Sequence, residues 1–172
     1  GYGAALSGLI KTSKEKANLI QFQAAYGKGI ASYLVSYDGL NYDAIVIDRG
    51  VLSTVPVIGA WISYEHWISI SWHANLVFGA SNFATTNISE WTINGDQMYQ
   101  AQNTAISLEN RYMLINLMYD PIPGLTLGIE YNQGYAQNSF EGNITDEGGN
   151  LSSNLEKERI AKRISFGAFF DF

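Results

Sequence analysis

The stretch Ile70-Ser-Trp-His-Ala-Asn-Leu-Val-Phe-Gly-Ala-Ser81 alternates apolar side chains with polar or small ones over about twelve residues. Successive side chains of an extended strand point to opposite faces, so Trp72, Leu76 and Phe78 share one apolar face. His73 and Asn75 lie on the other, polar face. Strands of soluble sandwiches usually have about five or six residues, whereas a tilted strand needs roughly 9–11 to cross a bilayer. The pattern therefore predicts a membrane-crossing strand with one face toward lipid.

The same alternation recurs along the chain. Ile20, Phe22 and Tyr26 share an apolar face, and Gln21 and Gln23 lie opposite them. The less regular runs 1–10 and 105–119 add further strands. Both faces of the run 105–119 are apolar, so the sequence does not show which face points to lipid. Seven antiparallel strands are predicted, at residues 1–10, 17–28, 57–67, 69–81, 105–119, 125–136 and 158–172.

The connections between these strands alternate in length. Short ones are expected near residues 11–16, 66–69 and 120–124, and long polar loops at 28–54, 82–103 and 137–157. Within the first long loop, Ala44 to Asp48 can pair locally. Outer-membrane barrels have short periplasmic turns and long outside loops. The sequence therefore predicts an all-β fold, an antiparallel transmembrane β-barrel, with residues 1–172 forming one barrel segment.

Composition agrees with this fold class. Charged residues make up 15% of the 172, against about 25% in an ordinary soluble domain, and aromatic residues reach 13%. The longest uncharged window contains His, Ser and Asn, so it does not predict a spanning helix. A net charge of −6 gives no electrostatic reason to bind nucleic acid. The lack of cysteine excludes a disulfide framework and a cysteine-based zinc site.

The number of strands bears on the size of the barrel. Bacterial single-chain barrels have an even number of strands, and seven cannot close alone in that scheme. The run from Gly1 to Ile10 already reads as a strand. We therefore expect the chain to be the carboxyl-terminal portion of a larger barrel.

Several segments resemble outer-membrane proteins. Ile164-Ser-Phe-Gly-Ala-Phe-Phe-Asp-Phe172 resembles the assembly signal that the barrel-assembly machinery reads, with Phe166, Phe170 and Phe172 as its aromatic positions. The segment 116–131 resembles the penultimate hairpin of the DcaP-like porins. Residues 26–33 and 56–67 also resemble pieces of that family.

This resemblance implies a trimeric, 16-stranded channel of the bacterial outer membrane for small hydrophilic, often anionic solutes. The chain would cover about the second half of such a barrel. Its partners would be membrane lipid, lipopolysaccharide, two further copies of the protein and the passing solutes. The constriction loop of such porins normally lies in the other half.

The polar faces of the predicted strands carry the candidate pore lining. It consists of Gln21, Gln23, His73, Asn75, Glu130, Arg159 and Arg163. Arg159 and Arg163 are four residues apart on one strand, so both point inward, roughly 13 Å apart. Two permanent cations on a pore wall attract anions. Alternatively, they pair with lumen acids such as Glu130 and only stiffen the wall.

No catalytic constellation can be assembled, and neither an enzyme activity nor a cofactor is predicted. His66 and His73 lie on opposite faces, which disfavours a zinc site with Glu65. Asp146 to Asn150 lacks the spaced acids of a calcium loop. The acidic residues predicted in the loops suggest that divalent cations are held there against lipopolysaccharide: Asp38, Asp43, Glu90 and Asp96.

Three functions remain open from the sequence. The first is a passive porin channel that works by sieving and electrostatics. The second is an outer-membrane barrel that uses its long loops as an adhesin or receptor. The third is a soluble sugar-binding sandwich, in which the aromatic side chains would fill a core instead of facing lipid.

Overall fold

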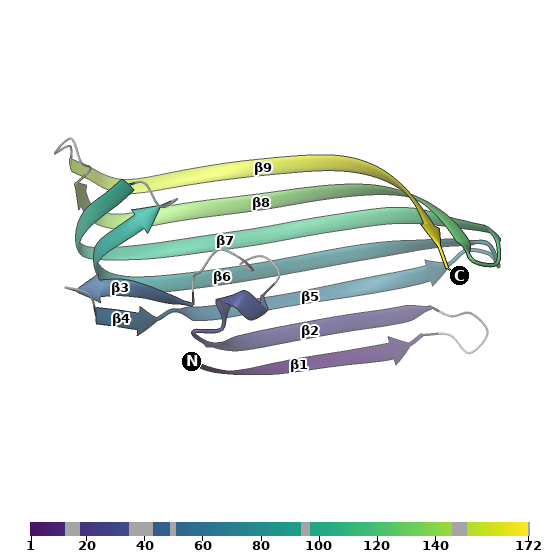
Figure 1. The fold of residues 1–172 in the computed structure, drawn as a ribbon, viewed down its shortest axis with the longest axis horizontal. Coiled ribbons are helices and arrows are strands. Elements are labelled where there is room, and N and C mark those ends of the chain that lie inside the picture. Colours follow the sequence, from purple (N-terminus) through teal and green to yellow (C-terminus); the bar gives the residue numbers. More distant parts are fainter. Residues whose placement is uncertain (13–17, 35–42, 49–50, 94–96, 146–150, 172) are drawn as a thin grey trace.

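The computed structural model describes residues 1–12, 18–34, 43–48, 51–93, 97–145 and 151–171. Seven strands form one antiparallel sheet in which each strand pairs with the next (Figure 1). Its strands, in spatial order, are β1 (Tyr2–Lys11), β2 (Leu19–Lys28), β5 (Pro56–Trp67), β6 (Trp72–Ile93), β7 (Gln97–Ile122), β8 (Leu125–Thr145) and β9 (Leu151–Phe170). The predicted antiparallel all-β fold with seven strands is confirmed.

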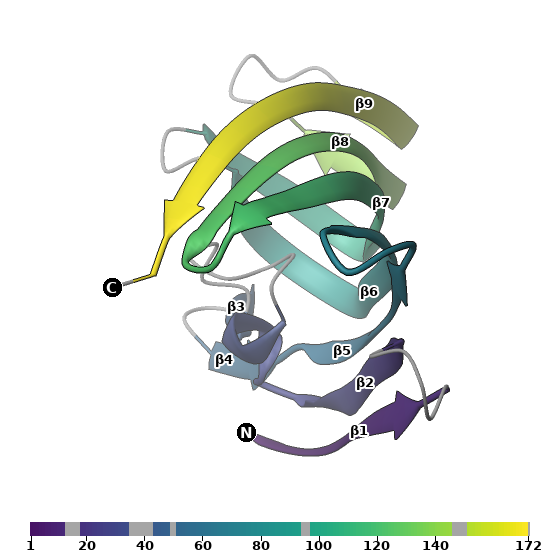
Figure 2. The same ribbon diagram turned by 90° about the vertical axis from the view of Figure 1, so that its right-hand side faces the viewer.

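The sheet is strongly curved. Seen along the strands it bends into an open trough, with β1 and β9 at its two edges (Figure 2). The concave side holds the short 3₁₀ helix η1 (Ala31–Tyr33) and a hairpin of β3 (Ala44–Asp48) and β4 (Val51–Thr54). Within the described residues the sheet does not close on itself. No helix in this part of the chain is long and apolar enough to cross a bilayer.

The prediction of two long loops at 82–103 and 137–157 is wrong. β6 and β7 pair beyond Asn82, and β8 and β9 pair beyond Gln137, so both segments are mainly β-hairpin. Threonine and aromatic residues such as Thr92 and Trp91 favour extended backbone even where no apolar face is required. Register shifts between Thr85 and Ile88 interrupt this pairing, which explains why regular alternation is lost there.

Smaller expectations about the connections hold. Ala44 to Asp48 does pair locally, because it forms β3 against β4. The turn between β7 and β8 has Pro123 and Gly124 at its centre, and Gly124 has a φ of +81°. Proline followed by a glycine with positive φ suits a type II turn. The charged turn expected at 11–16 falls largely outside the described residues.

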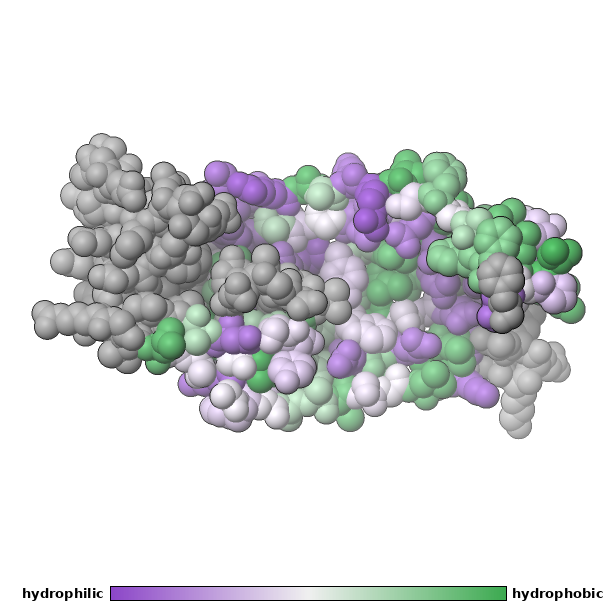
Figure 3. Space-filling view, viewed as in Figure 1, coloured by the Kyte–Doolittle hydropathy of each residue, from purple (hydrophilic) through white to green (hydrophobic). Residues whose placement is uncertain are grey.

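The two faces of the sheet differ in exposure. On the face turned away from η1, Ile58, Ile62 and Phe78 are 54%, 50% and 46% exposed. On the concave face, Val57 and Phe83 are 1% exposed. Figure 3 views the concave side, where hydrophilic and near-neutral residues follow the middle of the sheet and hydrophobic ones gather near the short turns. The side chains predicted to share an apolar face, such as Trp72, Leu76 and Phe78, therefore lie on the outward side of the sheet, and His73 and Asn75 lie on the concave side.

One glycine on the concave face is required by packing. Gly79 lies opposite Tyr112 in the ladder between β6 and β7, and a Cβ atom at position 79 would overlap the Tyr112 ring. At Gly134, which pairs with Tyr112 from the other side, nothing lies within 4 Å of an added Cβ. The ring therefore rests over β6, in the space that Gly79 leaves.

Replacing Gly79 by alanine should lower the free energy of unfolding by about 1–3 kcal/mol, because the Tyr112 ring must move. Gly134→Ala is the matched control and should change it by about 0.5 kcal/mol or less. Urea titration followed by tryptophan fluorescence measures both. Equal effects of the two substitutions would contradict this packing.

Candidate functional site

The register places all seven predicted lining residues on the concave face. Asn75 pairs with Asn116, Asn116 with Glu130, and Glu130 with Ser165, so these four form one row across β6 to β9. Each of the other five predicted residues is an even number of positions along its strand from a residue of this face, so its side chain points to the same side. They are Gln21, Gln23, His73, Arg159 and Arg163. Side-chain parity in the sequence was sufficient to assign this face.

Hydrogen bonds order the concave face near the short turns. Asn116 Oδ1 accepts from the backbone N–H of Asn75 at 3.1 Å and from its Nδ2 at 3.0 Å. Thr126 donates to Asp120 Oδ1 at 2.5 Å. Asp120 Oδ2 lies 3.3 Å from Nδ1 of His73, near enough for an ion pair with a protonated ring but not aligned as a hydrogen bond. These contacts cross from β6 through β7 to β8 and tie the three strands together.

Another hydrogen bond, further from the short turns, joins a predicted residue to one that was not predicted. Trp61 Nε1 donates to Oε1 of Gln23 at 3.0 Å, which links β5 to β2. Trp61 lies between Gln23 and Gly79 in the same row. The concave face thus carries aromatic rings, Trp61 and Tyr112, among its amides.

Cations gather on the concave face of β9. Arg163 Nη2 lies 3.3 Å from Glu130 Oε1, and the Arg163 side chain is still 68% exposed. Arg159 is exposed and pairs in register with Ala136 rather than with an acid. Lys157 has the same parity as both arginines and is also exposed. β9 therefore presents three cations on this face, and one of them, Arg163, lies beside an acid of β8, Glu130.

Lys157 is a lining candidate that sequence reasoning missed. The predicted strand began at residue 158, whereas β9 begins at Leu151. The sequence did contain the signal, because Lys157 is two residues before Arg159 and must share its face in any strand that includes both. Asn116 and Tyr112 were missed for another reason, since both faces of that run are apolar in the sequence.

A short stretch of chain lies against the concave face. This inward segment, residues 29–34, contains η1, and its Ala31 is completely buried. The Leu34 methyl groups lie 3.0 and 3.1 Å from where a Cβ on Gly59 would be, and Ile30 Cδ1 approaches the equivalent position on Gly27 at 2.7 Å. Glycines in the sheet therefore allow the inward segment to lie flat on it.

Backbone and side-chain bonds hold the inward segment in place. Gly29 N–H donates to the Val55 carbonyl at 3.0 Å, and Val55 N–H donates to the Asp43 carbonyl at 3.1 Å. The Asp43 carboxylate accepts from the N–H of Ser32 at 3.1 Å and from its hydroxyl at 2.8 Å. The backbone bond from Ser32, aided by its hydroxyl, outweighs the effect of burial and holds the pKa of Asp43 below 3.8.

The remaining predicted residues lie elsewhere. Phe166 and Phe170 of the predicted assembly signal are 79% and 64% exposed on the outward side of β9; Phe172 lies outside the described residues. Asp38 and Asp96 also lie outside them, and the side chain of Glu90 is not described. His66 is outward, where Nδ1 lies 3.1 Å from the Tyr64 hydroxyl, so it faces away from His73. Within the described part of the chain, no three His, Asp or Glu side chains group as metal ligands.

Scans against protein-family models, curated proteins and solved structures find no match to this chain. The resemblance to the DcaP-like porins therefore stays a prediction. Function has to be argued from the arrangement of the two faces of the sheet.

Replacing Asp43 by asparagine should loosen the inward segment at pH 7. A carboxyl whose pKa is lowered by folding stabilises the fold above its ordinary pKa of 3.8, and this stabilisation is lost as pH falls through the lowered value. Asp43→Asn removes the charge at any pH, so hydrogen-exchange protection of the Ser32 amide should fall several-fold.

The wild-type protein should lose the same protection only below pH 3.8, after correction for intrinsic exchange. The control is Asp171→Asn, which changes an exposed carboxylate beside the short turn at Gly124. Unchanged protection in Asp43→Asn would contradict the anchoring role.

Proposed function

We propose that the sheet is part of a transmembrane β-barrel of the bacterial outer membrane, and that its concave face lines a passive channel for small hydrophilic solutes. The observation that carries this proposal is the path of the boundary between apolar and polar residues on the outward face. Moving from the short turns toward the long hairpins, the first polar outward residue is Asn82 on β6, Arg111 on β7, Gln133 on β8 and Lys162 on β9.

This boundary does not follow the rows of paired residues. Arg111 pairs with Ala80, two residues before Asn82, and Gln133 pairs with Met113, two residues after Arg111. Lys162 pairs with Gln133 itself. The boundary therefore moves about four residues toward the short turns in three strand-to-strand steps.

The slope of this boundary gives a tilt. With a rise of about 3.4 Å per residue and about 4.8 Å between strands, the slope corresponds to a tilt of roughly 40–45°. Strands of outer-membrane barrels tilt by about 35–45° to the membrane normal. A flat slab of hydrocarbon around tilted strands requires such a diagonal boundary, whereas exposure to water does not.

Aromatic residues at the other edge of the apolar band agree with a membrane. Trp72 and Tyr119 stack on the outward face near the short turns, with ring centroids 4.5 Å apart. Tyrosine and tryptophan collect at membrane interfaces because one end of the ring is apolar and the other polar. This pair would lie at the periplasmic interface.

The concave face carries the side chains that would select among solutes by charge and size. Lys157, Arg159 and Arg163 on β9, with Glu130 of β8 beside Arg163, make this side of the concave face positive, which raises the local concentration of anions without any binding step. Glu65 and Asp120 lie on the same face nearer the short turns. The inward segment reduces the cross-section available to solutes next to Trp61 and Tyr112. The channel would work by charge and size, without turnover.

A closed barrel requires strands beyond the seven described, because β1 and β9 would otherwise expose unpaired backbone groups to lipid. The 16 strands implied by the resemblance to the DcaP-like porins would satisfy this requirement, and that resemblance also implies a trimer. Both remain part of the proposal.

A second function is favoured by the length of two hairpins. β6 and β7 continue for about ten residues beyond the boundary residue Asn82, and β8 and β9 continue similarly. Extended hairpins above a membrane are suitable binding elements for an adhesin or receptor. Conductance of the purified protein in planar bilayers separates a channel from a barrel that only binds.

Replacing Ile62 by arginine tests the membrane. Ile62 points outward and is 50% exposed, and a charge on a lipid-facing strand costs about 2–4 kcal/mol near the bilayer centre. The folded fraction in lipid vesicles, measured by heat-modifiable gel mobility, should fall strongly. Ser63→Arg, one residue further and on the concave face, is the matched control and should fold normally. Equal folding of both variants would sink the proposal.

Replacing Lys157, Arg159 and Arg163 together by glutamine tests the channel. The anion-to-cation permeability ratio, from the reversal potential in a salt gradient, should fall several-fold because the positive field is removed. Lys162→Gln removes a cation from the outward face of the same strand and should leave the ratio unchanged. An unchanged ratio in the triple variant would remove the anion preference from the proposal.

A further inference from the structure

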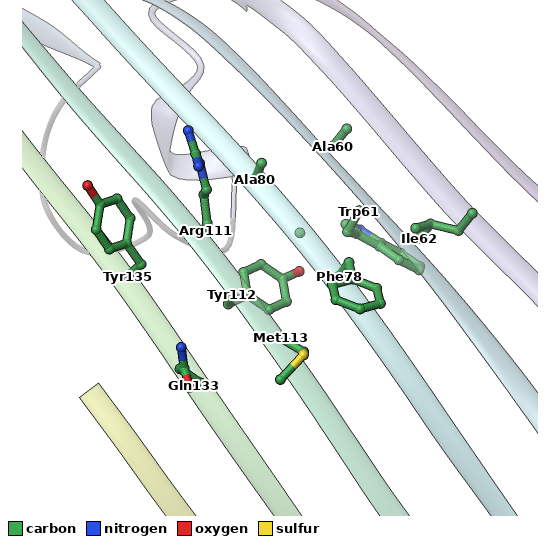
Figure 4. A pocket seen from close by; sticks show the side chains of 11 residues that line it. Ala60, Trp61, Ile62, Phe78, Ala80, Arg111, Tyr112, Met113, Gln133 and Tyr135 are labelled. Carbon is green, nitrogen blue, oxygen red and sulfur yellow. The ribbon is translucent and has the colours of Figure 1, made fainter. Parts of the chain in front are cut away.

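Three aromatic side chains border one crevice on the concave face, where the inward segment meets the sheet. They are Trp61 of β5, Tyr112 of β7 and Tyr33 of η1. Figure 4 looks at a larger neighbouring depression of about 640 Å³ and shows Trp61 and Tyr112 on either side of β6. We call these three side chains the aromatic cluster.

The larger depression is not open to a solute in the channel. Most side chains around it belong to the outward face, such as Ile62, Phe78 and Ala80, and these would face lipid. The aromatic cluster lies on the same face as Gln23 and the other predicted lining residues. A solute in the channel would therefore meet the cluster.

Gly79 leaves room for the aromatic cluster. Trp61 pairs with Gly79, and Gly79 pairs with Tyr112, so β6 places no side chain between the two rings. The Tyr112 ring extends over Gly79 toward β5, because an added Cβ atom at position 79 would overlap it. The two rings therefore lie on the concave face with only backbone between their strands.

Hydrogen bonds fix parts of the cluster before any ligand binds. Trp61 Nε1 donates to Gln23 Oε1 at 3.0 Å, which orients the indole. The backbone N–H of Tyr33 donates to the Ile30 carbonyl at 3.1 Å, which holds η1 in its turn. Tyr33 is still 81% exposed, so its ring is open to solvent. Groups that are ordered in advance lower the entropy cost of binding.

The polar groups of the crevice are neutral. Among the residues that the structure describes, no charged one lines it. The hydroxyls of Tyr33 and Tyr112 can each donate and accept a hydrogen bond, and the amide nitrogen of Gln23 carries two donors. The crevice therefore combines aromatic surface with hydroxyl and amide groups, and it has no charge of its own to attract an ion.

We propose that the aromatic cluster binds a neutral sugar, with the C–H face of a pyranose ring on the aromatic rings and its hydroxyl groups on the surrounding hydroxyls and amide. This inference rests on the proposed channel and names one class of solute for it. A pyranose has an apolar face and a rim of hydroxyls, which is the same combination. A purely apolar ligand would leave the amide and hydroxyls without partners, which costs free energy.

The cluster is separate from the cations of β9. Tyr112 pairs with Gly134, and Gly134 pairs with Ala161 of β9, so Trp61 is four strand-to-strand steps from β9. At about 4.8 Å per step, this is roughly 19 Å along the sheet. Salt screens charges over about 8 Å at physiological ionic strength. Sugar binding and anion preference should therefore respond to different substitutions.

The test measures binding of three neutral sugars, maltotriose, cellotriose and sucrose, to the complete protein by isothermal titration calorimetry. At least one should bind the wild type, with the same affinity at low and high salt because the ligand is uncharged. Trp61→Leu and Tyr33→Leu should each lower that affinity about tenfold or more, because leucine lacks the flat aromatic face. Trp61→Phe keeps a ring and should recover part of the loss.

Tyr26→Leu is the matched control. It removes a tyrosine that is 58% exposed on the outward face of β2, and it should bind sugar like the wild type. Because Tyr33 is exposed and contributes to no strand, Tyr33→Leu should fold even if Trp61→Leu does not.

Absence of binding to all three sugars, or unchanged affinity in Tyr33→Leu and Trp61→Leu, would overturn the sugar site. Tighter binding of adenosine than of any of the sugars would overturn it in favour of an aromatic ligand. In planar bilayers, the bound sugar should reduce the conductance of the wild type and not that of Tyr33→Leu. A protein that binds sugar but forms no conducting channel would instead overturn the proposed function.

Discussion

Backbone pairing in register is the constraint on which the two faces of this sheet depend. The strands pair in the order β1, β2, β5, β6, β7, β8 and β9, so the direction of one side chain determines the direction of all its row partners. Slipping one ladder by a single residue would exchange the apolar and polar faces of a strand. The position of Trp61 between Gln23 and Gly79 illustrates how closely the rows are matched.

Much of this arrangement could be predicted from alternation alone. The face of His73 and Asn75 follows from Trp72 and Leu76, because parity within a strand does not depend on its neighbours. The continuation of β6 to Ile93 could not be predicted, since pairing without an apolar face leaves only weak propensity signals.

The row of Ala60, Ala80 and Arg111 on the outward face also could not be predicted from the sequence. Ala60 and Ala80 are twenty residues apart and become neighbours only through the register of β5 and β6. Arg111 joins them from a third strand, in a run whose two faces are both apolar and could not be oriented. A feature carried by one strand can be predicted from the sequence, whereas a feature formed by a row of residues from several strands requires knowledge of the strand pairing.

The connection between β2 and β5 has a consequence for the kinetics of assembly. Every other ladder joins strands linked by a few residues, but this one must close the loop formed by residues 29–55. Closing a loop of that length costs about 2 kcal/mol more entropy than closing a four-residue turn. Early collapse of Ala31, Leu34 and Val55 onto the strands would shorten the effective loop. The slowest step of sheet formation is then set by a segment that contributes no strand to it.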